Sequence, residues 1–392
     1  MDKGNWTYRK LEEVAESELG KTLDSKKNTG NLNPYLCAVN VQWDRFELDA
    51  LKEMKFEEWE KERYSIREGD LVVCEGGDIG RCAIWNKKET VLYQNALHRV
   101  RFNGEMLPRF CMYFLMNLKK SGELDAKYGK GVTIKHLVKS SLLSISVPVP
   151  PLPIQQRIVA ELDCISSILE KKRQQLKELD NLAQAIFYDM FGDPVENEKG
   201  WEVNSLNRIT LLKNGLNFGR VDEGIKVKIL GVSDFQENKK ISSKEIGYTI
   251  VSKEVEDNFY LKDNDLVFVR SNGSKSLIGR CVLINTFGEK VSFSGFCIRC
   301  RIISDKVIPQ FLLSLMQEPK VKVQLTCGGR GCNIQNINQE NLGKQPVILP
   351  PLSLQQSFAA KIEAIEKQKE RISQSIKEVQ TLFDSRMQEY FG

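Results

Sequence analysis

Pro150-Pro151-Leu152-Pro153-Ile154-Gln155-Gln156 recurs as Pro350-Pro351-Leu352-Ser353-Leu354-Gln355-Gln356, a spacing of 200 residues in a chain of 392. Each copy continues without a gap to the same ending, Phe191-Gly192 and Phe391-Gly392. Because an internal repeat defines the architecture before any local motif does, the chain is predicted to contain two similar modules. Two similar surfaces suit a ligand with approximate twofold symmetry, and duplex DNA is the commonest such ligand.

Upstream of the double proline the repeat is looser and rests on separated anchors. The matching stretches are Gly69-Asp70-Leu71-Val72 with Asn264-Asp265-Leu266-Val267, Gly80-Arg81-Cys82 with Gly279-Arg280-Cys281, Arg99 and Arg101 with Arg299 and Arg301, and Gly129-Lys130-Gly131 with Gly329-Arg330-Gly331. Between these anchors the modules share little, which indicates one scaffold with two divergent surfaces. The predicted divisions are variable domains at 1–150 and 193–350 and constant segments at 151–192 and 351–392.

The constant segments are predicted to be long helices. From Ile154 to Phe191 there is no proline or glycine, and residues that favour helices dominate. Apolar residues recur at alternating spacings of four and three, as in a coiled-coil seam: Ile165, Leu169, Leu176, Leu179 and Ile186, and again Ile365, Ile372, Ile376, Val379 and Phe383. We expect the two helices to pack on each other as an antiparallel coiled coil with pseudo-twofold symmetry. The stripe alone leaves open a partner in another subunit or a core within its own domain.

The variable domains are predicted to be α+β, each a mixed domain of about 150 residues. Short β-rich runs lie at 71–74, 266–269, 281–284 and 296–302. Pro108 to Leu118 and Pro309 to Met316 are typical of short helices opened by proline. We expect a soluble, cytoplasmic protein, because no stretch resembles a signal peptide or a membrane span. The ten cysteines are then expected to be reduced thiols.

The charge is distributed unevenly in the same sense in both modules. Residues 1–78 have a net charge of −6 and residues 79–150 of +8; residues 193–258 sum to −2 and 259–350 to +6. A single charged run is usually only a solvated surface. Its recurrence in both modules favours a basic half-domain that binds phosphate.

No pattern in the sequence supports catalysis, a metal site or a cofactor site. The two histidines, His98 and His136, have Ile298 and Asn336 at the corresponding places of the second module. Asn33-Pro34-Tyr35 lacks the second proline of the amino-methyltransferase loop, and the glycine-rich runs lack the context of a nucleotide loop. Cys297 and Cys300 lie an odd number of residues apart on an expected strand, so their side chains point to opposite faces.

The glycine-rich turns carry the residues that can contact DNA. Arginine grips guanine, and asparagine or glutamine grips adenine, through paired hydrogen bonds in the major groove, although such turns are also common on ordinary surfaces. The candidate DNA-binding residues are Arg81, Gln94, Asn95, Arg99, Arg101, Lys130, Thr133, Lys135, Asn272, Ser274, Lys275, Arg280, Arg299, Arg301, Arg330, Asn333, Gln335 and Asn336.

These motifs together resemble the specificity subunits of type I restriction–modification systems. The resemblance covers the whole chain and rests on the Pro-Pro-Leu-x-x-Gln-Gln openings, on Glu75-Gly76-Gly77-x-x-Gly80-Arg81 with Gln94-Asn95, and on Asn272-Gly273-Ser274 with Ile278-Gly279-Arg280. The second module lacks a clear Gln-Asn pair, which we interpret as a different target.

The resemblance implies a non-catalytic subunit that reads a bipartite, asymmetric site on double-stranded DNA. Its implied partners are two adenine-methylating modification subunits, with restriction subunits where the system has them, and S-adenosylmethionine binds the modification subunits. The alternative is a two-headed adaptor between proteins, which the charge distribution disfavours.

Overall fold

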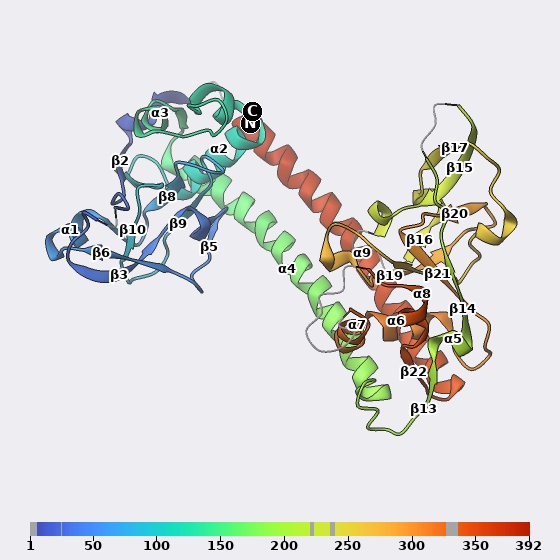
Figure 1. The fold of residues 1–392 in the computed structure, drawn as a ribbon. Coiled ribbons are helices and arrows are strands. Elements are labelled where there is room, and N and C mark those ends of the chain that lie inside the picture. The colour runs from blue at the N-terminus through green and yellow to red at the C-terminus, as the bar shows by residue number, and fades with distance from the viewer. Residues whose placement is uncertain (1–5, 25, 220–222, 236–239, 327–335) are drawn as a thin grey trace. The chain divides into compact units, whose positions relative to one another are not determined.

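The computed structural model describes residues 6–24, 26–219, 223–235, 240–326 and 336–392. The chain forms two compact units: Met1–Arg173 with Gln374–Gly392, and Gln174–Ser373. Each unit combines a mixed domain with parts of two long helices (Figure 1). The predicted α+β class is confirmed. The divisions at 150, 192 and 350 stay a prediction, and each unit also takes in part of both constant segments.

The first unit contains two four-stranded sheets, in the orders β2-β11-β8-β9 and β6-β3-β10-β7, and two strand pairs, β1-β12 and β4-β5. The helix α2 (Pro108–Lys120) covers one face of the first sheet with Phe110, Phe114 and neighbouring side chains in the main core. The strands are β1 Thr7–Lys10, β2 Ala15–Leu19, β3 Asn31–Leu36, β4 Val41–Gln42, β5 Arg45–Phe46, β6 Lys52–Phe56, β7 Ser65–Ile66, β8 Leu71–Cys74, β9 Cys82–Ile84, β10 Val91–Tyr93, β11 Leu97–Phe102 and β12 Ser146–Val149; the shorter helices are α1 Glu58–Arg63 and α3 Lys139–Leu143.

The second unit repeats this plan. Its five-stranded sheet, β14-β21-β18-β19-β16, corresponds strand for strand to β2-β11-β8-β9 and adds one edge strand; beside it lie a three-stranded sheet, β17-β15-β20, and the pair β13-β22. The strands are β13 Glu202–Ser205, β14 Thr210–Asn214, β15 Ile225–Leu230, β16 Lys240–Ser242, β17 Tyr248–Val251, β18 Leu266–Val269, β19 Cys281–Asn285, β20 Val291–Phe293, β21 Cys297–Ile302 and β22 Pro346–Leu349; the helices are α5 Leu206–Ile209, α6 Pro309–Gln317, α7 Pro319–Thr326 and α8 Gln339–Gly343.

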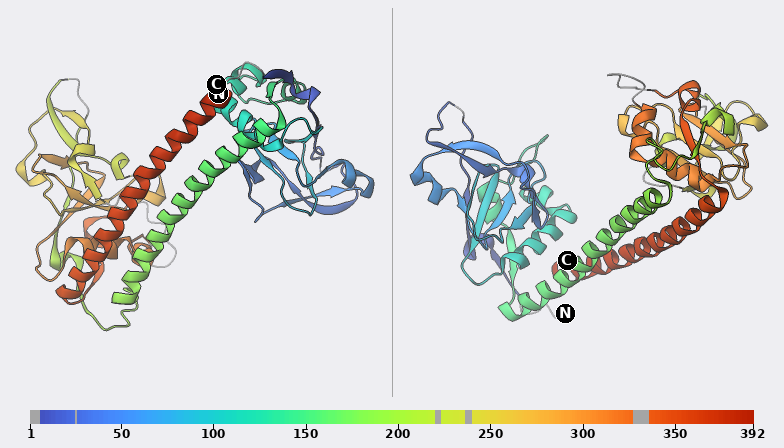
Figure 2. Two further views of the ribbon diagram at one scale, coloured as in Figure 1. Left: turned by 180° about the vertical axis from the view of Figure 1, so that it is seen from behind. Right: turned by 90° about the horizontal axis from the view of Figure 1, so that it is seen from below.

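The constant segments form two helices of 40 residues, α4 Leu152–Phe191 and α9 Leu352–Phe391, each unbroken along its length (Figures 1 and 2). In the first unit the start of α4 packs with the end of α9, and in the second unit the end of α4 packs with the start of α9. The helices are therefore antiparallel in both units. Among the described helices none combines the length and apolar composition needed to cross a lipid bilayer.

The helix seam lies largely where the heptad pattern predicts it. Ile165, Leu169, Ile376, Val379 and Phe383 join the first unit's core, and Leu179, Ile186 and Ile365 join the second unit's core. Leu176 and Ile372 are half-buried and belong to neither cluster. The pattern misses a second set of buried side chains, Ile158, Leu162, Phe187, Phe358 and Ile362. Ile158, Leu162, Phe358 and Ile362 extend the same stripe toward the start of each helix, and all five side chains complete the cores of the mixed domains.

The shared Phe-Gly ending closes a mixed-domain core. Phe391, at the end of α9, packs edge-on against Phe110 of α2, with ring centroids 5.2 Å apart. Phe191, at the end of α4, packs in the same way against Phe311 of α6 at 4.8 Å. Each mixed domain is thus completed by the start of one long helix and the end of the other, which explains why both endings are alike.

The Pro-Pro-Leu-x-x-Gln-Gln opening attaches each long helix to its mixed domain. Gln155 is fully buried; its Oε1 accepts from Leu107 N at 2.8 Å, and its Nε2 donates to Glu105 O at 2.9 Å and Pro150 O at 2.8 Å. Gln355 repeats all three bonds with Ile308, Lys306 and Pro350, at 3.0, 2.9 and 2.8 Å. Both glutamines hold the segment that leads into the proline-opened helix, α2 or α6.

Candidate nucleic-acid interface

Three segments that the sequence analysis singled out meet at one end of β8 and β11 in the first unit. Glu75 N donates to Ala96 O at 2.9 Å, and Glu75 O accepts from Leu137 N at 2.7 Å. The loop from Gly129 to His136 is closed by a reciprocal backbone pair between Lys130 and His136, both bonds 2.8 Å. We call residues 75–77, 94–96 and 129–137 the first strand-end cluster.

The second unit builds the same backbone arrangement. Arg270 N donates to Phe296 O at 2.8 Å, and Arg270 O accepts from Ile337 N at 2.9 Å. Ser271 forms an isolated antiparallel β-bridge with Asn336, just as Gly76 does with His136. Residues 270–272, 294–296 and 336–337 are the second strand-end cluster. Arg330, Asn333 and Gln335 lie outside the described residues, so their predicted contacts remain untested.

One glycine lies behind the turn of each cluster, Gly20 in the first unit and Gly215 in the second, and neither was predicted from the sequence. A Cβ on Gly20 would lie 2.4 Å from Tyr93 O, and a Cβ on Gly215 would lie 2.1 Å from Ser294 O. Both distances are far below contact, so only glycine lets the chain pass so close behind the turn. The available signal was that each glycine lies 14 residues after a tryptophan, Trp6 or Trp201.

The structure also shows what replaces the Gln-Asn pair in the second unit. The turn at Gln94 and Asn95 between β10 and β11 corresponds to Ser294 and Gly295 between β20 and β21, because Lys21 and Leu216 make equivalent bridges to Gln94 and Ser294. Gln94 and Asn95 are half-buried, and their side chains bond to no described residue. The same turn therefore presents amides in one unit and a small polar surface in the other.

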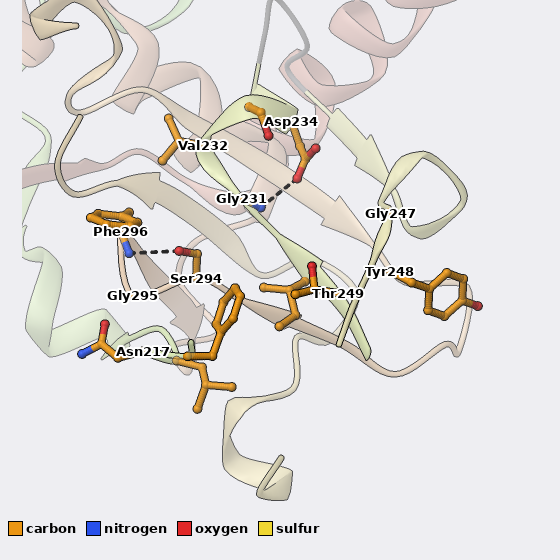
Figure 3. Close-up of a pocket in the computed structure, with 14 residues that line it drawn as sticks. Asn217, Gly231, Val232, Asp234, Gly247, Tyr248, Thr249, Ser294, Gly295 and Phe296 are labelled. Carbon is orange, nitrogen blue, oxygen red and sulfur yellow. Dashed lines mark hydrogen bonds between the residues drawn. The ribbon is translucent and has the colours of Figure 1, made fainter. Parts of the chain in front are cut away.

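Beside the second turn lies a cavity of about 580 Å³ (Figure 3). Its wall carries Asn217, Asp234 and Thr249, with Ser294 and Phe296 of the turn on one side. Asp234 accepts a hydrogen bond from Gly231 N, and Ser294 Oγ accepts one from Phe296 N at 3.3 Å. Two aromatic side chains at its edge are largely exposed, Phe296 at 62% and Tyr248 at 67%. No sequence pattern singled out these two aromatic residues.

The loop of the first cluster projects from the domain with basic and apolar side chains on its surface. Lys130 and Thr133 are exposed and Lys135 is half-exposed, and neither lysine has an ion-pair partner among the described residues. Val132 is 99% exposed and Ile134 63% exposed. Six of the twelve cations in residues 79–150 form ion pairs within the unit, for example Lys119 with Asp78 and Asp125. The unpaired lysines of this loop therefore dominate the local charge.

The four arginines of the two Arg-x-Arg pairs bind groups within their own domains and lie outside the strand-end clusters, so their contact with DNA stays a prediction. Arg99 and Arg299 are 9% and 6% exposed and donate to backbone carbonyls inside their domains. Arg101 forms a two-bond ion pair with Asp70, at 2.7 and 2.9 Å. Arg301 does the same with Asp265, at 2.8 and 2.7 Å. These contacts explain why the Asp and Arg-x-Arg anchors recur together.

The remaining candidates are divided between internal and open positions. Arg81 is half-buried and donates to Ala38 O at 2.9 Å, and Arg280 is half-buried with a partner inside the chain. Asn272 is half-buried, while Ser274 and Asn336 are exposed. The side chain of Lys275 lies outside what the structure describes.

The residue that joins the three segments carries opposite charge in the two clusters. Glu75 is half-buried, its pKa is raised by burial, and its carboxylate has no hydrogen-bond or ion-pair partner among the described residues. Arg270 stands at the equivalent place, half-buried, and its Nε is likewise buried without a described partner. One backbone frame thus presents an acceptor in one unit and a donor in the other.

The buried thiols and the buried histidine belong to the domain cores. Cys297 and Cys300 lie in different hydrophobic clusters on opposite faces of β21, as their spacing predicts, and burial raises the pKa of each to about 12. His98 is fully buried and its Nε2 lies 2.7 Å from Leu137 O; burial lowers its pKa to about 4. None of these groups lies in an arrangement suited to nucleophilic or acid–base chemistry.

The fold and the two clusters define a duplicated protein with two binding domains on one scaffold. The model of the type I restriction modification DNA specificity domain matches residues 3–180 and again 198–381. The chain therefore belongs to this family.

Several characterised proteins and solved structures are similar to the chain. It is 25% identical to the type I restriction enzyme StySPI specificity subunit of Salmonella potsdam and 22% identical to the EcoKI specificity subunit of Escherichia coli K12, over 60% and 67% of this chain. These matches span 53% and 61% of the relatives' own lengths. A putative MjaX specificity subunit of Methanocaldococcus jannaschii is 21% identical over 96% of this chain and 92% of its own length.

In fold, the chain is similar to the S subunit of a type I restriction–modification system from M. genitalium, with a TM-score of 0.54 at 14% identity over 99% of this chain and 96% of that one. A chain from a structure of type I R-M complex assembly gives 0.60 at 16% identity over 98% and 97%.

Proposed function

We propose that this chain is the non-catalytic DNA-recognition subunit of a type I restriction–modification complex. Each mixed domain reads one half of a bipartite, asymmetric DNA site, and the chain positions two adenine-methyltransferase subunits on it. Restriction subunits join where the system has them, and S-adenosylmethionine belongs to the methyltransferase subunits. Family membership and the similar specificity subunits support this proposal.

One observation carries the proposal beyond family resemblance. The two strand-end clusters share backbone hydrogen bonds and differ in the side chains they present: Glu75 against Arg270, and Gln94-Asn95 against Ser294-Gly295. Carboxylates accept hydrogen bonds from cytosine amino groups, arginine donates to guanine, and amides pair with adenine. One frame with different donors and acceptors suits two half-sites of different sequence.

The proposed contacts are of two kinds. Lys130 and Lys135 neutralise phosphates, which fixes the register without reading sequence. The turn at 94–96 and its counterpart at 294–296 face base edges. The exposed Phe296 makes an apolar contact with the methyl group of a thymine. The domains 1–150 and 193–350 are the proposed recognition modules.

The alternative is a two-headed protein adaptor, and binding to DNA separates it from our proposal. The test uses the purified chain with its methyltransferase partner and a library of duplexes at several salt concentrations. We expect sequence-selective binding that weakens steeply with salt, and adenine methylation only when the partner is present. Binding without sequence preference, or methyl transfer by the chain alone, would contradict the proposal.

A further inference from the structure

Among the described residues, an ion pair joins the two long helices at one place in each unit. In the first unit Glu161 of α4 lies 2.9 Å from Arg386 Nε of α9 and accepts a hydrogen bond from Tyr390 Oη at 2.6 Å. In the second unit Lys369 of α9 lies 2.9 Å from Asp180 of α4, and its side chain is only 18% exposed. At both places α4 supplies the acid and α9 supplies the base.

The internal repeat shows that neither pair has an equivalent in the other unit. At an offset of 200 residues, Glu161 and Arg386 correspond to Lys361 and Ile186. Tyr390 corresponds to Met190, and Lys361 Nζ lies 3.9 Å from Met190 Sδ, so these positions correspond in space as well. The shape of the seam is repeated and its charge is not.

The second pair shows the same asymmetry. Asp180 and Lys369 correspond to Gln380 and Leu169. Leu169 is 4% exposed in the first unit's core, and Gln380 Oε1 lies 3.5 Å from Arg173. The first unit therefore has an arginine–glutamine hydrogen bond where the second has an ion pair.

The repeated shape makes pairing of each helix with a second copy of itself the nearest competing arrangement. Two copies of α4 in the same antiparallel register would place Glu161 against Ile186 and Asp180 against Leu169. The pair would then leave both Glu161 carboxylates without Arg386, while each Asp180 would take the place of Gln380 beside Arg173. Half-buried charges without partners are costly.

Two copies of α9 would fail for the opposite reason. Lys361 would take the place of Glu161 beside Arg386, which brings two cations together, and Lys369 would face Gln380 in place of Asp180. Repulsion between like charges in an unwanted pairing is a general way to enforce pairing specificity.

We infer that the charged residues of the seam make α4 pair with α9 and not with a second copy of itself. We call this arrangement the charge code: acids on α4, at Glu161 and Asp180, and bases on α9, at Lys369 and Arg386. The partner that each helix surface fits is the other half of this repeat. The code keeps two recognition domains of different sequence together in one molecule, and it is independent of what those domains bind.

The test exchanges the coding side chains in the full-length chain. One variant gives α9 the α4 code (Lys361→Glu, Lys369→Leu, Gln380→Asp, Arg386→Ile). A second gives α4 the α9 code (Glu161→Lys, Leu169→Lys, Asp180→Gln, Ile186→Arg). A third carries all eight changes, which restores one acid–base pair in each unit and leaves the net charge of the chain unchanged.

Chemical unfolding should show that each one-sided exchange lowers the folding equilibrium constant about fivefold or more, since each half-exposed ion pair contributes about two- to fivefold. The eight-residue variant should recover most of this loss, and all differences should shrink in 1 M salt. One-sided variants as stable as the original chain would overturn the inference.

If the eight-residue variant does not fold, the two-residue cycle of Glu161→Arg and Arg386→Glu decides. Partial rescue by the second change supports the code. Additive losses overturn it.

Discussion

Replacing Gln155 by alanine should destabilise the first unit far more than any neighbouring polar change. The substitution removes the partners of three backbone groups: the N–H of Leu107 and the carbonyls of Glu105 and Pro150. The side chain is fully buried, so the loss falls on groups away from solvent. A buried unsatisfied group costs about 1–3 kcal/mol, and water entering the vacated space offsets part of this. We expect a loss of about 3 kcal/mol.

The assay is thermal and denaturant unfolding of the full chain, followed by calorimetry and circular dichroism. For a domain of this size about 3 kcal/mol lowers Tm by roughly 6–12 °C. Gln156→Ala is the matched control, because Gln156 is the adjacent residue and is exposed; its effect should stay within about 0.5 kcal/mol. Gln355→Ala should repeat the large loss in the second unit.

A further variant separates hydrogen bonding from packing. Gln155→Glu keeps the volume and the acceptor for Leu107 but places an oxygen against the carbonyls of Glu105 and Pro150. It should therefore be at least as destabilising as alanine at neutral pH. If Gln155→Ala behaves like Gln156→Ala, the role assigned to the repeated motif is refuted.

Three further predictions follow from the geometry. Gly20→Ala and Gly215→Ala should each lower stability by more than about 2 kcal/mol in unfolding experiments, because the new Cβ meets backbone at 2.4 and 2.1 Å; Gly247→Ala, whose new Cβ meets nothing within 4 Å and whose φ is not positive, is the matched control. Because burial lowers the pKa of His98 to about 4, the unfolded chain binds more protons between pH 6.5 and 4, so the first unit should lose up to about 3 kcal/mol as pH falls through this window; His98→Ile, the residue of the second unit, should flatten the dependence in a pH series of melts. Lys130→Ala with Lys135→Ala should weaken binding to all duplexes alike and reduce the salt slope by about two in a titration, and an altered base preference would instead assign these lysines to base reading.

The sequence predicted the scaffold well because its signals are local or periodic. The heptad stripe and the absence of proline and glycine predict α4 and α9, and β8, β18 and α2 coincide with their apolar runs and opening proline. The parallel pairings of β3 with β10 and of β15 with β20 were not predicted, because they join segments far apart in the chain.

The candidate interface was predicted less completely, since surface position depends on tertiary contacts. Arg99 and Arg101 look like surface cations in the sequence, but one binds backbone carbonyls and the other binds Asp70 inside the domain. Gly20 and Gly215 carried a usable signal in their equal distance from Trp6 and Trp201, whereas the exposure of Phe296 on the edge of a cavity had none.

We propose that each domain reads one half-site through its own strand-end cluster. Sequencing of methylated adenines in cells that carry this chain and its methyltransferase partner tests it most directly, when the original chain is compared with one bearing Gln94→Ser and Asn95→Gly. We predict a two-part methylated sequence that vanishes without the chain and changes in only one part in the variant. Methylation that does not depend on the chain, or a change in both parts together, would contradict the claim.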